Sequence, residues 1–198
     1  MWNYLVKNGF SRKQGGKCPC NCGETTMKKL LLIIKIFLSL FAALIVLPYI
    51  VAPIRHDYKM HRFDASISKI PAPSGYKKVA QKKWFGLLWA CGNHADYLVI
   101  AVFRGADNDS FVYDYFENDF GVYCPEEESD ARPFIYKHHG GKWYYVGKDE
   151  TVEENKDSMS DSTTGKSYIT KFALESTEPL YFVVYSAQGA ADSDLRTH

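Results

Sequence analysis

The residues whose types most suggest chemistry are Cys91, His94 and Asp96, which lie within one short stretch. A histidine beside a cysteine can take the thiol proton and activate the sulfur as a nucleophile, as in thiol hydrolases. The cysteine and histidine of such enzymes usually come from distant parts of the sequence, however, and a turn alone provides no pocket. A small envelope thiol hydrolase is therefore our alternative hypothesis and not our leading one.

The five cysteines divide into Cys18, Cys20 and Cys22 near the N-terminus and Cys91 and Cys124 further on. An even pair in an oxidising compartment favours a disulfide, so we predict a bond between Cys91 and Cys124, with two buried thiols as the alternative. Such a bond would exclude Cys91 as a nucleophile. The three N-terminal cysteines lack the fourth ligand and the C-x-x-C spacing typical of structural zinc, so we predict no metal site and no cofactor.

The elements that must position these residues begin with an apolar segment at 30–54. Within its first eighteen positions only Lys35 and Ser39 are not apolar. A run of this length can cross a bilayer as a helix. The best match to a signal-peptidase site, Ile50-Val51-Ala52, has a bulky first residue, so we predict an uncleaved single-pass anchor.

The basic residues on the two sides of this segment indicate its orientation. Six Lys or Arg residues precede it and four follow it closely. The positive-inside rule then places the N-terminus in the cytoplasm. We predict a single-pass protein of the cell inner membrane with its C-terminal domain on the exported, periplasmic side. Met27, which precedes two lysines, is a second possible translation start.

The chain divides into five predicted parts: a disordered N-terminal segment at 1–29, the transmembrane helix at 30–54, an extended tether at 55–75, one exported domain at 76–189 and a flexible tail at 190–198. The tether is predicted from its mixed charges and prolines, and its His56 and His61 are expected at the membrane interface. Residues 55–198 hold 17 Lys or Arg and 22 Asp or Glu, a net charge of −5. That charge argues against nucleic acid as a partner.

Short alternating or apolar segments separated by turn residues predict a mainly antiparallel β domain, a small sandwich or half-open barrel. The predicted strands lie at 82–92, 97–104, 110–116, 133–139, 142–146, 167–174 and 180–187. Residues 97–103 are apolar on both faces, which predicts a central strand. Two glycines at 140 and 141 indicate a hairpin. An α+β fold is the alternative, with a helix over 77–91, where apolar residues also fit helical spacing.

Aromatic residues are frequent, 30 of 198, and several alternate along the predicted strands. A sheet face that carries amphipathic rings suits contact with a peptide, glycan or protein. The alternative is that β proteins favour aromatics for packing. The predicted contact residues are Tyr113, Tyr115, Trp143, Tyr145, Tyr181 and Tyr185.

An acidic segment from Asp149 to Asp161 has six carboxylates against one lysine. We predict that it is a long loop without regular structure. Glu150, Glu153 and Glu154 could steer a basic partner towards the domain, since exposed charges act mainly on the rate of encounter. The alternative is a solvated loop with no binding role.

These features favour a membrane-anchored, exported protein that acts through contacts with another protein, as an inhibitor of immunity type or as an accessory of an envelope complex. The thiol hydrolase is the alternative from another class. A further alternative is a structural membrane subunit that assembles through its helix around Lys35, because a charge within a membrane can pair with another subunit.

Overall fold

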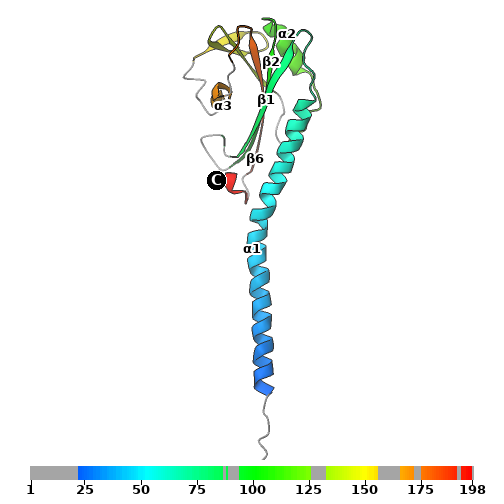
Figure 1. Cartoon of the computed structure of the whole chain (residues 1–198), viewed down its shortest axis with the longest axis vertical. Coiled ribbons are helices and arrows are strands. Elements are labelled where there is room, and N and C mark those ends of the chain that lie inside the picture. The colour runs from blue at the N-terminus through cyan, green and yellow to red at the C-terminus, as the bar shows by residue number, and fades with distance from the viewer. Residues whose placement is uncertain are drawn as a thin grey trace, which may run out of the picture. The chain divides into compact units, whose positions relative to one another are not determined.

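The computed structural model describes residues 22–86, 88, 94–125, 133–155, 166–171, 175–190 and 193–197 (Figure 1). The chain forms two units, Met1–Leu44 and Ile45–His198. Helix α1 (Cys22–Ser68) is long and apolar enough to cross a membrane, as its length and composition show. Its apolar side chains in the first unit are exposed, with Phe37 71% accessible.

The second unit contains one open antiparallel sheet of six strands in the order β1-β2-β6-β3-β4-β5. The strands are β1 (Lys77–Gly86), β2 (His94–Arg104), β3 (Phe134–His139), β4 (Lys142–Val146), β5 (Thr151–Glu154) and β6 (Leu180–Ala190). The last strand, β6, lies between β2 and β3 and so joins the β1–β2 hairpin to the β3–β4–β5 meander. Residues 97–103 of β2 are at most 1% exposed, which confirms the predicted central strand.

Two helices pack on one side of this sheet, which we call the helix-covered face. Met60, Phe63 and Ile67 of α1 and Val112 and Phe116 of α2 (Asp109–Glu117) are buried there. On the opposite face, Ile169 of α3 (Lys166–Lys171) packs with residues of the sheet that include Trp143 and Phe182. A short 3₁₀ helix, η3 (Leu195–Thr197), follows β6.

The last turns of α1 belong to the domain, so the prediction of an extended tether at 55–75 is wrong over residues 55–68. Buried residues recur every three or four positions along this part of the helix: Ala52, His56, Met60, Phe63 and Ile67. That spacing places them on one side of a helix. Burial of this stripe holds residues 55–68 helical despite their mixed charges.

His56, predicted at the membrane interface, is buried in the domain at 1% exposed. Its ring stacks on Phe85 with centroids 4.8 Å apart, and its Nδ1 forms a hydrogen bond with the Tyr97 hydroxyl. The C-terminal segment predicted as a flexible tail also contacts α1, because Arg196 forms an ion pair with Asp57 of α1 at 2.8 Å. Arg196 forms a second ion pair with Asp194, within its own segment, at 2.7 Å.

The sheet differs from the predicted sandwich or half-open barrel because it is single and open. Helices take the place of a second sheet on the helix-covered face, so the α+β alternative describes the architecture better. The segment proposed as the helix of that alternative, 77–91, is strand β1 over its described part as far as Gly86.

Three local predictions are also corrected. Residues 110–116 lie in helix α2 and not in a strand, and α3 replaces the first part of the strand predicted at 167–174. Strand β5 lies within the predicted acidic loop. The hairpin at the glycine pair is confirmed: Gly140 and Gly141 have φ of 59° and 78°, the positive values of a type I′ turn, between β3 and β4.

Candidate functional site

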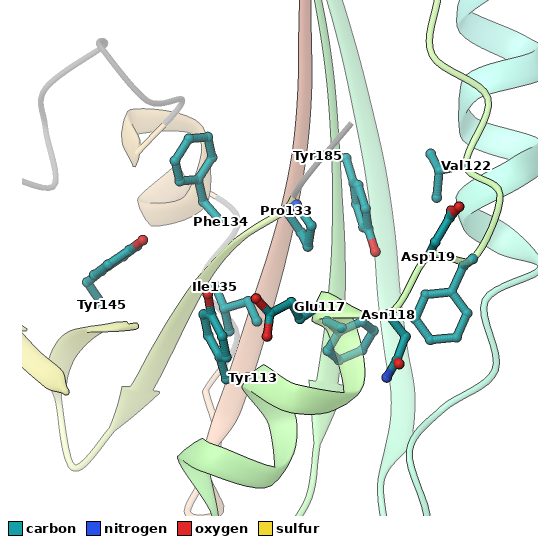
Figure 2. Close-up of a pocket in the computed structure, with 12 residues that line it drawn as sticks. Tyr113, Glu117, Asn118, Asp119, Val122, Pro133, Phe134, Ile135, Tyr145 and Tyr185 are labelled. Atoms are coloured by element: carbon teal, nitrogen blue, oxygen red, sulfur yellow. The ribbon is translucent and has the colours of Figure 1, made fainter. Parts of the chain in front are cut away.

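A groove of about 720 Å³ lies beside the C-terminal half of α2 (Figure 2). Its walls come from α2, from the segment that follows α2, and from strands β3, β4 and β6. Its described lining is Tyr113, Phe116, Glu117, Asn118, Asp119, Phe120, Val122, Pro133, Phe134, Ile135, Tyr145 and Tyr185. A volume of this order is typical of ligand sites, which cover about 300–1,000 Å³.

The lining combines aromatic and apolar side chains with two carboxylates, those of Glu117 and Asp119. Asp119 Oδ1 accepts a hydrogen bond from the Gly121 amide at 2.7 Å, which shapes the turn after the helix. Glu117 points into the space between α2 and β3 in Figure 2. The described lining has these two carboxylates and no basic residue.

One buried polar group in this lining is unsatisfied. Tyr185 is only 2% exposed, and its hydroxyl has no hydrogen-bond partner among the residues that the structure describes. Burial raises the pKa of this hydroxyl, and the nearby Tyr115 adds to that increase. The group is therefore a neutral donor and acceptor at physiological pH. Figure 2 shows it pointing towards the end of α2, where Glu117 and Asn118 lie.

The opposite end of α2 is fixed by a saturated polar cluster. Asn108 caps the helix by accepting a hydrogen bond from the Phe111 amide at 3.2 Å. Asp109, the first helical residue, accepts hydrogen bonds from Lys137 at 2.7 Å, from Tyr181 at 2.8 Å and from Thr151 at 2.8 Å. We call Asp107, Asp109, Lys137, Thr151 and Tyr181 the capping cluster. Because Lys137 lies on β3 and Tyr181 on β6, this cluster ties the start of α2 to the sheet.

The ionisation of this cluster follows from burial and pairing. Burial disfavours the charged form of Asp109, but hydrogen bonds from Lys137, Tyr181 and Thr151 outweigh it and lower the pKa of the carboxyl. Burial also disfavours the ammonium of Lys137, yet its bonds to Asp109 and Asp107 raise the pKa of that group. Burial and the bond to Asp109 raise the pKa of Tyr181. Lys137 and Asp109 are therefore a charged pair at neutral pH.

The structure does not bring the six predicted aromatic contact residues onto one surface. Tyr181 and Tyr185 are buried on the helix-covered face, and Trp143 is buried on the opposite face. Three of the six line the groove, namely Tyr113, Tyr145 and Tyr185. Tyr115 instead packs against Phe120 and donates a hydrogen bond to the Pro71 carbonyl.

The predicted acidic contact residues are partly paired. Glu153 forms an ion pair with Lys142 at 2.9 Å, and Glu154 forms one with Lys166 at 3.1 Å. Glu150 is exposed, and its carbonyl accepts a hydrogen bond from the Gly147 amide. The described part of the segment is therefore a sheet edge with ionic cross-links, and not an unpaired acidic loop.

The thiol-hydrolase residues and the disulfide remain predictions. Cys91 and the side chain of His94 lie outside the part of the chain that the structure describes, and Asp96 is buried with Oδ2 accepting a hydrogen bond from the Leu88 amide. The structure shows no disulfide among the residues it describes. Those residues also contain no group of three His, Cys, Asp or Glu side chains placed to hold a metal ion.

Most of the groove was not predicted from the sequence, in particular Glu117, Asn118 and Asp119 and their apolar neighbours on β3. One signal could have helped: Asn108 is a favourable N-cap, and Val112 and Phe116 lie one helical turn apart. Recognising that helix would have placed Glu117 at its C-terminal end.

Comparisons of the chain with protein-family models, with curated protein sequences and with solved structures find no match.

Proposed function

We propose that this chain is a membrane-anchored binding protein that recognises another protein through the groove beside α2. The observation that carries the proposal is the groove itself, whose described lining combines aromatic walls and carboxylates with a buried hydroxyl that no described residue pairs with. Aromatic side chains are enriched in protein interfaces because they contribute a large contact area with few rotatable bonds. An immunity-type inhibitor and an accessory of an envelope complex would both act through such contacts.

The apolar part of α1 supports the anchor in this proposal. Its exposed Leu, Ile and Phe side chains would be covered by lipid in a bilayer, whereas in water they would form a large apolar surface. With the N-terminus in the cytoplasm, the groove-bearing domain is exported and meets its partner outside the inner membrane. The basic residues before the segment favour this orientation.

Site-specific photo-crosslinking in cells that make the full-length protein tests the proposal. A benzoylphenylalanine at Tyr113 or at Phe134, both in the groove lining, should give the same discrete protein adduct. The matched control is the same photo-reactive residue at Lys171, which is exposed on α3, does not line the groove and should not give that adduct.

A second change shows whether the adduct depends on the groove. Phe134 is 39% exposed, so Phe134→Glu should alter the groove wall without opening the core, and it should abolish crosslinking from Tyr113. An adduct that forms equally from Lys171, or that survives the Phe134→Glu change, would show that the groove is not the recognition surface.

A further inference from the structure

We infer that the groove binds the side chain of an arginine or lysine presented by a basic segment of the partner protein. The inference rests on the proposed function and adds the chemistry of the ligand. Three independent features of the groove support it: the Tyr185 hydroxyl, the charge at the end of α2, and the aromatic walls.

The first feature is the Tyr185 hydroxyl. A buried hydroxyl without a hydrogen bond is unfavourable, and such groups are uncommon in folded proteins. Tyr185 lines the groove, and its hydroxyl points towards the end of α2 in Figure 2. A hydroxyl oxygen has lone pairs that can accept from an ammonium or guanidinium donor. A bound cationic side chain would therefore supply the missing partner.

The second feature is the negative charge that the described residues place at the end of α2. The C-terminal end of a helix carries about half a negative charge, which favours a cation nearby. Helix α2 has no basic residue in its last turn and ends at Glu117, with Asp119 two residues further on. Glu117 has no ion-pair partner among the described residues. A basic side chain in the groove would lie close to both the helix end and this carboxylate.

The third feature is the apolar wall beside the carboxylate. Tyr113, Phe116 and Ile135 line the groove on the helix-covered face, beside space suited to the methylene stem of Lys or Arg. A guanidinium can also stack on an aromatic ring, and desolvation strengthens that contact. Such walls favour a cation attached to an aliphatic chain over a bare metal ion, which prefers oxygen ligands.

A peptide is a better occupant than a free amine because the apolar surface extends beyond the groove. Phe134 at the rim is 39% exposed, and Val152, whose neighbour across the sheet is Tyr145, is 44% exposed. The groove volume of about 720 Å³ also exceeds what one small cation fills. Residues next to the basic side chain in a partner could cover these positions.

Titration calorimetry on the full-length protein in nanodiscs tests this inference. The probe is acetyl-Leu-Arg-Leu-amide, and its neutral counterpart has citrulline in place of arginine. We expect the arginine peptide to bind at least tenfold more tightly, which is the size of one charge-assisted hydrogen bond. Glu117→Gln should lower the affinity for the arginine peptide about tenfold, so that the arginine and citrulline peptides bind with similar affinity.

Tyr185→Phe and Asp114→Asn complete the design. Tyr185→Phe removes one oxygen and should weaken arginine-peptide binding about fivefold to tenfold. Asp114 is exposed on the same helix but does not line the groove, so Asp114→Asn should leave the affinity within twofold. An equal loss of affinity for the arginine peptide in Glu117→Gln and Asp114→Asn would show that general charge attraction drives binding, which would overturn the inference.

The remaining outcomes separate this inference from the proposed function. Equal affinity for the arginine and citrulline peptides would overturn the inference, while groove-dependent crosslinking to a protein would keep the proposed function. Binding of free arginine amide as tightly as the peptide would show that a small cation is the ligand, which would contradict a peptide partner.

Discussion

Tyr181 and Tyr185 are two buried tyrosines on the same strand and the same face, yet their hydroxyls differ in hydrogen bonding. The Tyr181 hydroxyl donates to Asp109 at 2.8 Å and accepts from the Asn108 amide at 3.1 Å. The Tyr185 hydroxyl has no partner among the described residues. The first lies at the start of α2 and the second beside its end.

This difference shows how one short helix serves two purposes. At its start, the capping cluster satisfies every carboxylate oxygen of Asp109 and fixes the helix on the sheet. At its end, the Glu117 carboxylate and the buried Tyr185 hydroxyl line a groove, and the hydroxyl has no hydrogen-bond partner among the described residues. Polar groups that stabilise the fold are paired within the chain, whereas groups kept for a ligand are paired only when it binds. Four predictions test this contrast.

The largest effect is expected at Lys137. Replacing it with Met would leave Asp107 and Asp109 without their cation at a site where Lys137 is 7% exposed. We expect a loss of about 3 kcal/mol in the free energy of unfolding, as for other buried ion pairs that lose one partner. Urea unfolding of the full chain in detergent micelles, followed by tryptophan fluorescence, measures this loss.

The pH dependence of the stability lost in Lys137→Met tests whether that loss comes from the ion pair. Because the pKa of Asp109 is lowered in the folded protein, its contribution is present above its ordinary pKa of about 4 and is lost as the pH falls through the folded value. Because the pKa of Lys137 is raised, its contribution is lost only as the pH rises above about 10.5. The difference between wild type and Lys137→Met should therefore shrink below pH 4. A loss that is the same at pH 3 and pH 7 would contradict the ionic origin.

A smaller effect is expected for Tyr181→Phe. The change removes one hydroxyl and takes from Asp109 Oδ1 the hydrogen bond that Tyr181 donates, whereas the Asn108 amide keeps its bond to the Ala106 carbonyl at 3.0 Å. We expect a loss of about 1.5 kcal/mol in the free energy of unfolding. The same urea experiment measures this loss. A loss under about 0.3 kcal/mol, within the range of neutral surface changes, would show that the Tyr181 hydroxyl does not stabilise the fold.

The smallest effect is expected at Glu117. Replacing it with Lys places a cation at the C-terminal end of α2, which should stabilise the domain by about 0.5 kcal/mol. The same change should abolish binding of the arginine peptide, because the groove then repels the ligand. A destabilised Glu117→Lys variant would mean that the glutamate has a structural partner and is not kept for a ligand.

Several parts of the fold could be predicted from the sequence because their signals are local. The apolar run in α1, the apolar strand at 97–103 and the glycine pair at 140–141 each carry their own pattern. The buried residues in the last part of α1 also recur at helical spacing. That spacing was not recognised in the sequence because His56 and many charged residues interrupt the apolar pattern. A buried polar residue interrupts the apolar periodicity on which such a prediction depends.

The helix α2 was missed because aromatic residues at 111, 113 and 115 alternate as in a strand. Aromatic residues have high β propensity, but this segment is helical because the helix buries Val112 and Phe116. The groove could not be predicted, since its walls come from segments that are adjacent only in space: the end of α2, the start of β3 and the middle of β6. The condition of the Tyr185 hydroxyl is likewise visible only in the folded chain.

The most direct test of the central claim is the thermal unfolding of Tyr185→Phe, alone and with the arginine peptide. Without peptide, we expect the midpoint to equal or exceed that of wild type, because the lost hydroxyl has no hydrogen bond to any residue that the structure describes. With a saturating amount of peptide, the midpoint of wild type should rise and that of Tyr185→Phe should rise less, since stabilisation follows affinity. A variant that is as unstable as Tyr181→Phe without peptide, or that gains as much as wild type with it, would contradict the claim that Tyr185 is kept for a ligand.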